Sequence, residues 1–241
     1  MSLRVLVFDL DDTLLDERPG RLAGRAALAA TLRESAPHVS QERFAAAYER
    51  AATIFWGDER RHRRGRLDLV AARVEIVSAA LSEIGHANEL DAREASRRYH
   101  DAATASHRLM PGALEALECA RERVDRLVLL TNGAADPQTA KIGRFDLASW
   151  FDHIQIEGVF GLGKPEPEAF RHAVEAVGAT VGEALMVGND FDHDVLGALG
   201  AGLEAVWVDV HARGAPAEPP VGLCGTIQDI RQLPKLLGSR G

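Results

Sequence analysis

Two aspartates separated by one residue stand at the end of the first apolar run of the chain. Asp9 and Asp11 lie in the stretch FDLDDT, which closes the run RVLVFDL and also contains Asp12 and Thr13. In an extended chain, side chains two residues apart point to the same side. Paired carboxylates can do acid–base work, and their hard oxygens suit Mg²⁺. The stretch therefore predicts catalytic or metal-binding chemistry.

Three further groups of polar residues follow apolar runs in the same way. Thr131 and Asn132 stand at the end of RLVLLT, and Lys164 lies in GLGKPEP after a weaker run. The run EALMVG leads into an acidic stretch with Asn189, Asp190, Asp192 and Asp194. In open parallel sheets, ligands bind beyond the carboxyl ends of the strands. If these runs are strands of one sheet, carboxylates, a hydroxyl and a lysine converge on one site.

The elements that must position these residues alternate along the chain. The apolar runs cover residues 4–10, 126–131, 183–188 and 204–210, with a weaker run at 152–158. Continuous apolar runs are typical of strands that are buried on both faces. The helical patterns cover residues 111–124, 167–178, 193–203 and 226–237. This alternation predicts an α/β fold, a Rossmann-like doubly wound parallel sheet with helices on both faces.

Residues 16–108 interrupt this alternation. The segment has no valine-rich run, and its Ala, Arg, Glu and Leu fall in helical patterns. It contains 16 arginines and 14 acidic residues, a net charge of +2, whereas the rest of the chain carries −10. We therefore predict an inserted all-α domain at 16–108 and an α/β core made of residues 1–15 and 109–241.

Composition excludes several classes of protein. The net charge of −8 argues against general nucleic-acid binding. No apolar run approaches the roughly 20 residues of a membrane span, and the N-terminal run is too short for a secretory signal. We therefore expect a cytoplasmic protein without a membrane or nucleic-acid partner. Two isolated cysteines, Cys119 and Cys224, are expected to be structural thiols.

The polar groups together resemble the motifs of the haloacid dehalogenase superfamily. FDLDDT matches its D-x-D-x-T signature, and LLTNG, GKPEPEAF and VGNDFDHDVLGA are similar to its second, third and fourth motifs, in the same order. The helical insertion lies where one subgroup places a helical cap. Gln138 and Lys141 after TNG resemble the nucleotidase and N-acylneuraminate-9-phosphatase branch.

The resemblance implies a Mg²⁺-dependent phosphatase that acts on a small phosphorylated metabolite. Asp9 would attack phosphorus and form an aspartyl-phosphate. Asp11 would protonate the leaving oxygen and later deprotonate water, while its backbone carbonyl binds the metal. Thr131 and the amide of Asn132 would hold the phosphoryl oxygens, and Lys164 would neutralise the charge between phosphate and nucleophile.

Several other functions use part of this pattern of residues. A dehalogenase lacks the second aspartate, because no leaving oxygen needs a proton, whereas Asp11 is present here. A receiver-type signalling module has its acids in a different chain order. A phosphomutase uses the same residues and stays an alternative. So does a catalytically weakened binding protein, because Asn189 occupies the position of the usual acidic metal ligand.

Two expectations concern parts of the site that the motifs define less closely. We expect the metal to be held by Asp9, Asp11 and Asn189, with Asp190 and Asp194 nearby and Asp194 acting through water; the alternative is that Asp190 takes the place of Asn189 as the direct ligand. An asparagine adds less charge than an aspartate and should weaken Mg²⁺ binding. In the insertion, the stretch ERRHRRGR holds Arg60, Arg61 and Arg63, which could bind a second anionic group of the substrate by bidentate bonds.

Overall fold

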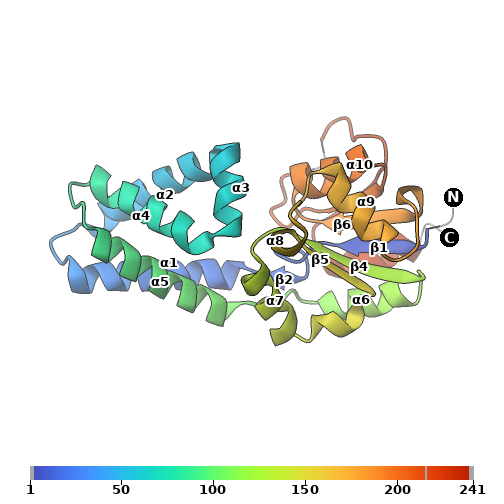
Figure 1. Cartoon of the computed structure of the whole chain (residues 1–241), viewed down its shortest axis with the longest axis horizontal. Helices are drawn as coiled ribbons and strands as arrows, with labels where there is room; N and C mark the ends of the chain where they lie inside the picture. The colour runs from blue at the N-terminus through green and yellow to red at the C-terminus, as the bar shows by residue number, and fades with distance from the viewer. Residues whose placement is uncertain (1–2, 215, 239–241) are drawn as a thin grey trace. The chain divides into compact units, whose positions relative to one another are not determined.

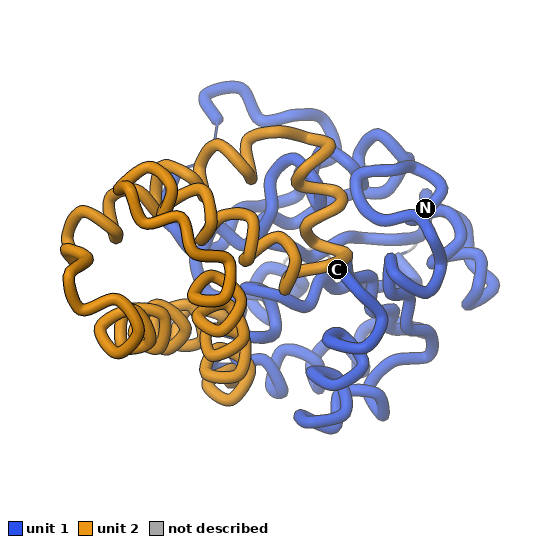
Figure 2. The backbone as a smooth tube through the Cα atoms, turned by 60° about the vertical axis from the view of Figure 1, so that its left-hand side comes forward, with its two compact units in different colours: residues 1–16, 109–241 blue, residues 17–108 orange. Residues whose placement is uncertain are grey.

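The computed structural model describes residues 3–214 and 216–238 of the chain. The described residues divide into two compact units, coloured separately in Figure 2. Unit 1 contains the N-terminal residues up to Asp16 and the residues from Leu109 onward, and unit 2 contains Glu17–Arg108. Each unit has a hydrophobic core of its own.

Unit 1 is built on a parallel sheet of six strands in the order β5-β4-β1-β6-β7-β8 (Figure 1). The strands are β1 (Val5–Phe8), β4 (Arg126–Thr131), β5 (His153–Ile156), β6 (Ala184–Gly188), β7 (Glu204–Val208) and β8 (Leu223–Ile227). Five of them lie in the five apolar runs. The prediction of an α/β fold with a doubly wound parallel sheet is confirmed.

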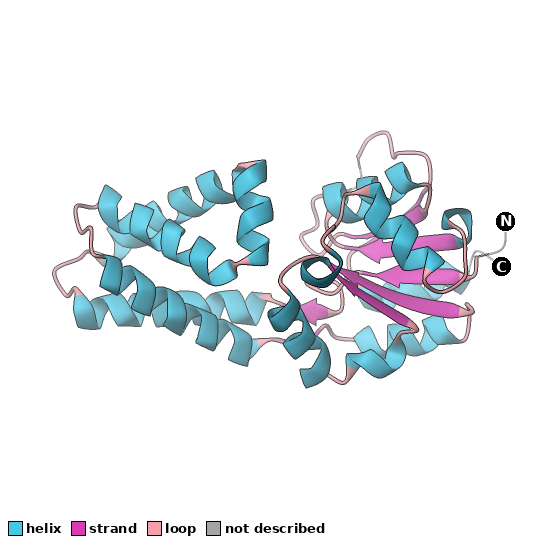
Figure 3. Cartoon of the chain, viewed as in Figure 1, coloured by secondary structure: helices cyan, strands magenta, loops and turns pink. Residues whose placement is uncertain are grey.

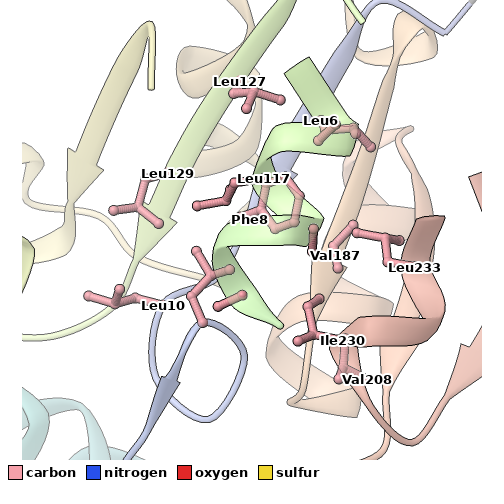
Figure 4. Packing of buried hydrophobic residues seen from close by; sticks show 14 of the residues in the cluster. Leu6, Phe8, Leu10, Leu117, Leu127, Leu129, Val187, Val208, Ile230 and Leu233 are labelled. Atoms are coloured by element: carbon pink, nitrogen blue, oxygen red, sulfur yellow. The ribbon is translucent and has the colours of Figure 1, made fainter. Parts of the chain in front are cut away.

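Burial on both faces explains why the strand sequences are apolar throughout. In β1, Leu6 and Phe8 belong to one core cluster, while Val5 and Val7 belong to the cluster on the opposite face. Figure 4 shows the first cluster, in which Phe8 lies among side chains from neighbouring strands and from two helices. Because β1 is central and has no exposed face, none of its four residues can be polar.

The helices of unit 1 cover both faces of this sheet. They are α6 (Ala113–Arg121), α7 (Ala135–Arg144), α8 (Glu157–Phe160), α9 (Pro167–Glu175), α10 (Gly197–Ala201) and α11 (Leu233–Gly238). A π-helical turn, Phe191–Leu196, runs directly into α10. Short 3-10 turns cover Leu147–Trp150, Val181–Glu183 and Ile230–Gln232.

One part of the sequence prediction is wrong. A helix was expected over 226–237, but Thr226 and Ile227 complete β8, and the helical turns begin only at Ile230. The sequence Leu-Cys-Gly-Thr-Ile has no apolar run, because β8 is an edge strand whose first four residues are only partly buried. An edge strand needs less apolar surface than a central one, so the pattern did not reveal it.

Apart from Arg108, which begins the strand Arg108–Leu109, the regular elements of unit 2 in the described residues are all helices, as predicted (Figure 3). Its helices are α1 (Arg18–Ser35), α2 (Gln41–Gly57), α3 (Glu59–Leu67), α4 (Leu69–Glu83) and α5 (Glu89–Ser106). The N-termini of the last four are capped by the side chains of Ser40, Asp58, Asp68 and Asn88. The chain leaves and re-enters unit 1 through β2 (Leu15–Asp16) and β3 (Arg108–Leu109), which pair with each other.

Candidate active site

The candidate site lies at the carboxyl ends of three neighbouring strands of unit 1. Asp9 directly follows β1, Thr131 is the last residue of β4, and Asn189 follows the last residue of β6. Since β1 pairs with β4 on one side and with β6 on the other, parallel pairing brings these three positions to one edge. The backbone N–H of Asp9 donates to the carbonyl of Val187, which continues the pairing past the end of β1.

A buried lysine between two carboxylates forms the centre of the site. Lys164 reaches in from the loop between α8 and α9, and its side chain is only 2% exposed. Its Nζ lies 2.5 Å from Oδ1 of Asp9 and 2.7 Å from Oδ1 of Asp194. The other oxygen of Asp194 accepts a hydrogen bond from the N–H of Asp190 at 2.9 Å. Three charges are therefore buried together, with one cation shared by two anions.

The pKa values of Asp9 and Lys164 follow from their burial and from this sharing of one cation. Burial raises the pKa of Asp9 above its usual value, Lys164 opposes that rise, and the nearby charge of Asp194 adds to it. Burial disfavours the charged form of Lys164 as well, but Asp194 and Asp9 together raise the pKa of its ammonium group above the ordinary lysine value. The lysine is thus held as a cation.

A threonine hydroxyl links Asp9 to the asparagine of the fourth motif. The Oγ1 of Thr13 donates to Oδ2 of Asp9 at 3.0 Å and lies 3.4 Å from Oδ1 of Asn189. The backbone carbonyl of Asn189 accepts a hydrogen bond from Nε1 of Trp207, which fixes the residue against β7. The side-chain oxygens of Asp9 and Asn189 therefore face the same hydroxyl.

Asp190 has a different environment. Its Oδ1 accepts hydrogen bonds from the backbone N–H groups of Asp192 and His193, at the start of the π-helical turn. The ring Nδ1 of His193 lies 3.1 Å from the same oxygen. Although partial burial alone would raise the pKa of Asp190, these hydrogen bonds hold it well below its usual range. The carboxylate therefore serves as a cap for this turn.

The structure does not bring the expected metal ligands together as a purely acidic cluster. Within residues 3–214 and 216–238, no three or more His, Cys, Asp or Glu side chains are arranged to hold a metal ion. Asp9 and Asp194 share Lys164, and Asp190 caps a turn. The side-chain oxygens of Asp9 and Asn189, which face the same hydroxyl of Thr13, are the oxygen donors here that could hold a metal ion.

The carboxylate of Asp11 is held by two residues of α7. Nζ of Lys141 lies 2.7 Å from its Oδ1, and Nε2 of Gln138 lies 2.9 Å from its Oδ2. The same Gln138 nitrogen lies 2.6 Å from Oγ1 of Thr131 and 2.9 Å from the carbonyl of Asn132. Gln138 and Lys141 were noticed in the sequence only as marks of a family branch. The sequence did contain a signal that these two side chains are buried, because they lie three residues apart on the helix face that also carries the buried Ile142.

Asn132 positions the loop that carries the lysine. Its side-chain nitrogen donates to the carbonyl of Lys164 at 2.8 Å, and its side-chain oxygen accepts from the N–H of Lys164 at 2.7 Å. A Cβ on Gly163 would lie only 2.6 Å from that oxygen and equally close to Glu157, so glycine is needed there. The buried carboxylate of Glu157 in turn accepts the N–H of Gly133. These supporting contacts of Asn132, Gly163 and Glu157 are not predicted by the sequence pattern.

The three arginines that were expected to contact the substrate lie on α3 of unit 2. Arg60, Arg61 and Arg63 are all exposed. Nε of Arg61 lies 3.8 Å from a carboxylate oxygen of Glu75 on α4.

In residues 3–214 and 216–238, no helix is both long and apolar enough to cross a membrane.

Comparison with known proteins shows the family of this chain. The family model for haloacid dehalogenase-like hydrolases matches residues 3–202. Phosphoserine phosphatase of Thermus thermophilus is 34% identical over 96% of this chain and 98% of its own length. The chain therefore belongs to the haloacid dehalogenase-like hydrolase family and is an enzyme of that family, which confirms the resemblance seen in the motifs.

Two further comparisons concern a family branch and the fold. N-acylneuraminate-9-phosphatase of Mus musculus is 33% identical over 55% of this chain and 54% of its own. The magnesium-bound structure of the HAD-hydrolase YfnB from Bacillus subtilis superposes with a TM-score of 0.74 at 24% identity, over 98% of this chain and 99% of that one. The second comparison shows that the whole chain shares the fold of that hydrolase.

The close approach of Gly188 to Asp194 makes a testable prediction. A Cβ at position 188 would lie 2.3 Å from Oδ2 of Asp194, the oxygen that accepts the N–H of Asp190. We expect Gly188→Ala to displace this buried carboxylate and to lower the free energy of unfolding by about 1–3 kcal/mol. Urea denaturation measures the change.

Gly143→Ala is the matched control, because a Cβ there meets no atom within 4 Å. Gly143 lies within α7, so alanine should stabilise the protein by up to about 1 kcal/mol. Equal stabilities of the two variants would show that the contact between Gly188 and Asp194 is not tight.

Proposed function

We propose that the protein is a Mg²⁺-dependent phosphomonoester hydrolase that acts on a small phosphorylated metabolite through an aspartyl-phosphate. The observation that carries the proposal is the environment of Asp9. Its buried carboxylate is held from one side by Lys164 and from the other by Thr13, at the edge of the sheet where ligands bind. The second carboxylate of the pair, Asp11, is held separately by α7.

In the first step, an oxygen of Asp9 attacks phosphorus, and the bond between phosphorus and the ester oxygen breaks. The protonated carboxyl group of Asp11 gives its proton to the leaving oxygen, which departs as an alcohol. Lys164 offsets the negative charge that gathers between Asp9 and the phosphoryl group. The hydroxyl of Thr131 and the backbone N–H of Asn132 hold phosphoryl oxygens.

In the second step, water attacks the phosphorus of the aspartyl-phosphate. Asp11, now ionised, takes a proton from this water, and the bond between phosphorus and the Asp9 oxygen breaks. Inorganic phosphate leaves, Asp9 is again a carboxylate, and Asp11 is again protonated. The same residue therefore serves as acid in one half of the reaction and as base in the other.

A magnesium site is supported by the side-chain oxygens of Asp9 and Asn189, which face the same hydroxyl of Thr13. Mg²⁺ is usually bound through one or two carboxylates, with water and substrate phosphate completing its shell. We propose that Asp9, the backbone carbonyl of Asp11 and the side-chain oxygen of Asn189 hold it. Asp194 would act nearby, and Asp190 would support the turn. When bound, the ion neutralises phosphate charge and so admits an anionic substrate to an acidic pocket.

Removal of the Asp9 nucleophile should abolish the reaction. We expect Asp9→Asn to lower phosphate release by at least about a thousandfold, because the amide cannot act as the proposed nucleophile. The assay is a panel of phosphomonoesters with and without Mg²⁺, including O-phosphoserine, a nucleoside monophosphate and an acylneuraminate phosphate. The wild-type protein should also form a hydroxylamine-sensitive phosphoenzyme.

Asp136→Asn is the control, since it makes the same chemical change at an exposed position of α7. Phosphate release retained in Asp9→Asn would refute the mechanism. Transfer of phosphate to a second position of the substrate, without release, would indicate a phosphomutase instead. A wild-type chain that binds esters but forms no phosphoenzyme would be the weakened binding protein.

Asn189 should limit the affinity for the metal. We expect Asn189→Asp to bind Mg²⁺ about tenfold more tightly, because a carboxylate replaces a neutral amide beside Asp9. Calorimetric titration of the protein with Mg²⁺ measures this directly, and the Mg²⁺ dependence of phosphate release measures it in turnover.

Gln228→Glu is the control for this variant, because it adds the same charge at an exposed position beyond β8. An affinity that does not rise in Asn189→Asp would show that Asn189 is not a ligand.

We propose further that the α3 arginines bind a second anionic group of the substrate. All three are exposed, and a guanidinium can bind a carboxylate with two parallel hydrogen bonds. We expect Arg60→Ala, Arg61→Ala or Arg63→Ala to raise KM about tenfold for substrates with a second anionic group. The kcat should change less.

A matched substrate pair sharpens this test, because O-phosphoserine and O-phosphoethanolamine differ only by a carboxylate. The rise in KM should be confined to O-phosphoserine. Arg93→Ala, an exposed arginine of α5 paired with Glu89, is the control. If none of the three α3 variants discriminates between the two substrates, these arginines do not recognise the second group.

A further inference from the structure

Two buried polar side chains of α7 end on the second aspartate of the site. Gln138 is 4% exposed and Lys141 is 8% exposed, and they lie three residues apart on one helix face. Burial of an amide and an ammonium group is costly unless each has hydrogen-bond partners. Lys141 contacts one oxygen of Asp11, and Gln138 contacts the other. The helix thus holds both oxygens of a single carboxylate.

The amide of Gln138 also connects this carboxylate to the end of β4. Its nitrogen lies within 2.9 Å of three acceptors, namely Oδ2 of Asp11, Oγ1 of Thr131 and the carbonyl of Asn132. Two of these acceptors belong to the strand end that we propose to bind phosphate. One side chain therefore sets the distance between the Asp11 carboxylate and the phosphate-binding hydroxyl.

The use of lysine at these positions supports a dedicated arrangement. The chain contains 25 arginines but only three lysines, and two of the three are buried at this site. Lys164 contacts Asp9 and Asp194, whereas Lys141 contacts Asp11. A compact ammonium on a flexible stem fits beside a single carboxylate oxygen where a planar guanidinium would need more room. The two aspartates of the D-x-D pair thus have separate cations.

We infer that Gln138 and Lys141 are a positioning pair that holds the Asp11 carboxyl group at a fixed place beside the phosphate site. This inference rests on the proposed function, in which Asp11 gives a proton to the leaving oxygen and takes one from water. The pair contacts the Asp11 carboxylate and is assigned no proton transfer of its own, so it acts through Asp11. Its loss should therefore impair proton transfer and leave the attack by Asp9 largely intact.

The dependence of kcat/KM on the leaving group tests this inference. This ratio reports the reaction up to release of the alcohol, so it isolates the step in which Asp11 is an acid. An alkyl phosphate needs that proton, whereas 2,4-dinitrophenyl phosphate has a stable leaving anion and does not. We expect Gln138→Glu and Lys141→Met to lower kcat/KM by about a hundredfold for the alkyl ester. The loss for the aryl ester should stay below about tenfold.

The variants are chosen to preserve the packing of α7. Gln138→Glu keeps the shape of the side chain but replaces the donor by an acceptor that faces Asp11. Lys141→Met keeps an unbranched stem without the charge, and Lys141→Arg should restore part of the alkyl-ester activity. Thr139→Ala, at an exposed position of the same helix, is the matched control and should leave the ratio of the two activities unchanged.

A second measurement separates positioning from phosphate binding. In an Asp11→Asn background, the α7 substitutions should cause no further change in the alkyl-to-aryl ratio, because they act through the same group. Equal losses for both esters, or an additional loss in that background, would overturn the inference. Failure of the proposed function would look different, since the wild-type protein would then form no phosphoenzyme and release no phosphate from either ester.

Discussion

Lys164 carries a buried positive charge between Asp9 and Asp194, and the rest of the site is arranged around it. An isolated charge in the protein interior is strongly unfavourable, so a lysine that is only 2% exposed must have anionic partners. Here two carboxylates share one cation. The two carboxylates keep the lysine charged, while burial, together with the nearby charge of Asp194, raises the pKa of Asp9. Removal of the lysine would leave two buried carboxylates without their cation.

The backbone around the trio is shaped to hold these charges at contact distance. Gly188 leaves room for Asp194 to fold back against the end of β6. Asn132 pairs with both the N–H and the carbonyl of Lys164, so the loop that carries the lysine is tied to the end of β4. Gly163 permits that approach, because any larger residue would collide with the asparagine side chain. These contacts fix the position of Lys164, although it lies in a loop.

The two aspartates of the D-x-D pair each contact a different lysine. Lys164 is directed at Asp9, whose proposed role is attack on phosphorus, while Lys141 is directed at Asp11, whose proposed role is proton transfer. Adjacent carboxylates that shared one cation would be coupled, and movement of one would disturb the other. Separate partners on different elements allow each carboxylate to be held independently. The loop between α8 and α9 supplies the first cation, and α7 supplies the second.

The sequence by itself determined the sheet, the helical insertion and the residues that gather at the strand ends. These features follow from local rules, because a strand buried on both faces must be apolar and parallel strands bring their carboxyl ends to one edge. β8 was not predicted by these rules, because this edge strand contains a glycine and a cysteine and has no apolar run. Only the tertiary structure decided which partner each polar group has. Asp190 and Asn189 are neighbours in the sequence, yet one caps a turn and the other faces the hydroxyl beside Asp9. Gln138 and Lys141 lie more than 120 residues from Asp11, and contacts over that separation depend on how the elements pack rather than on any local pattern.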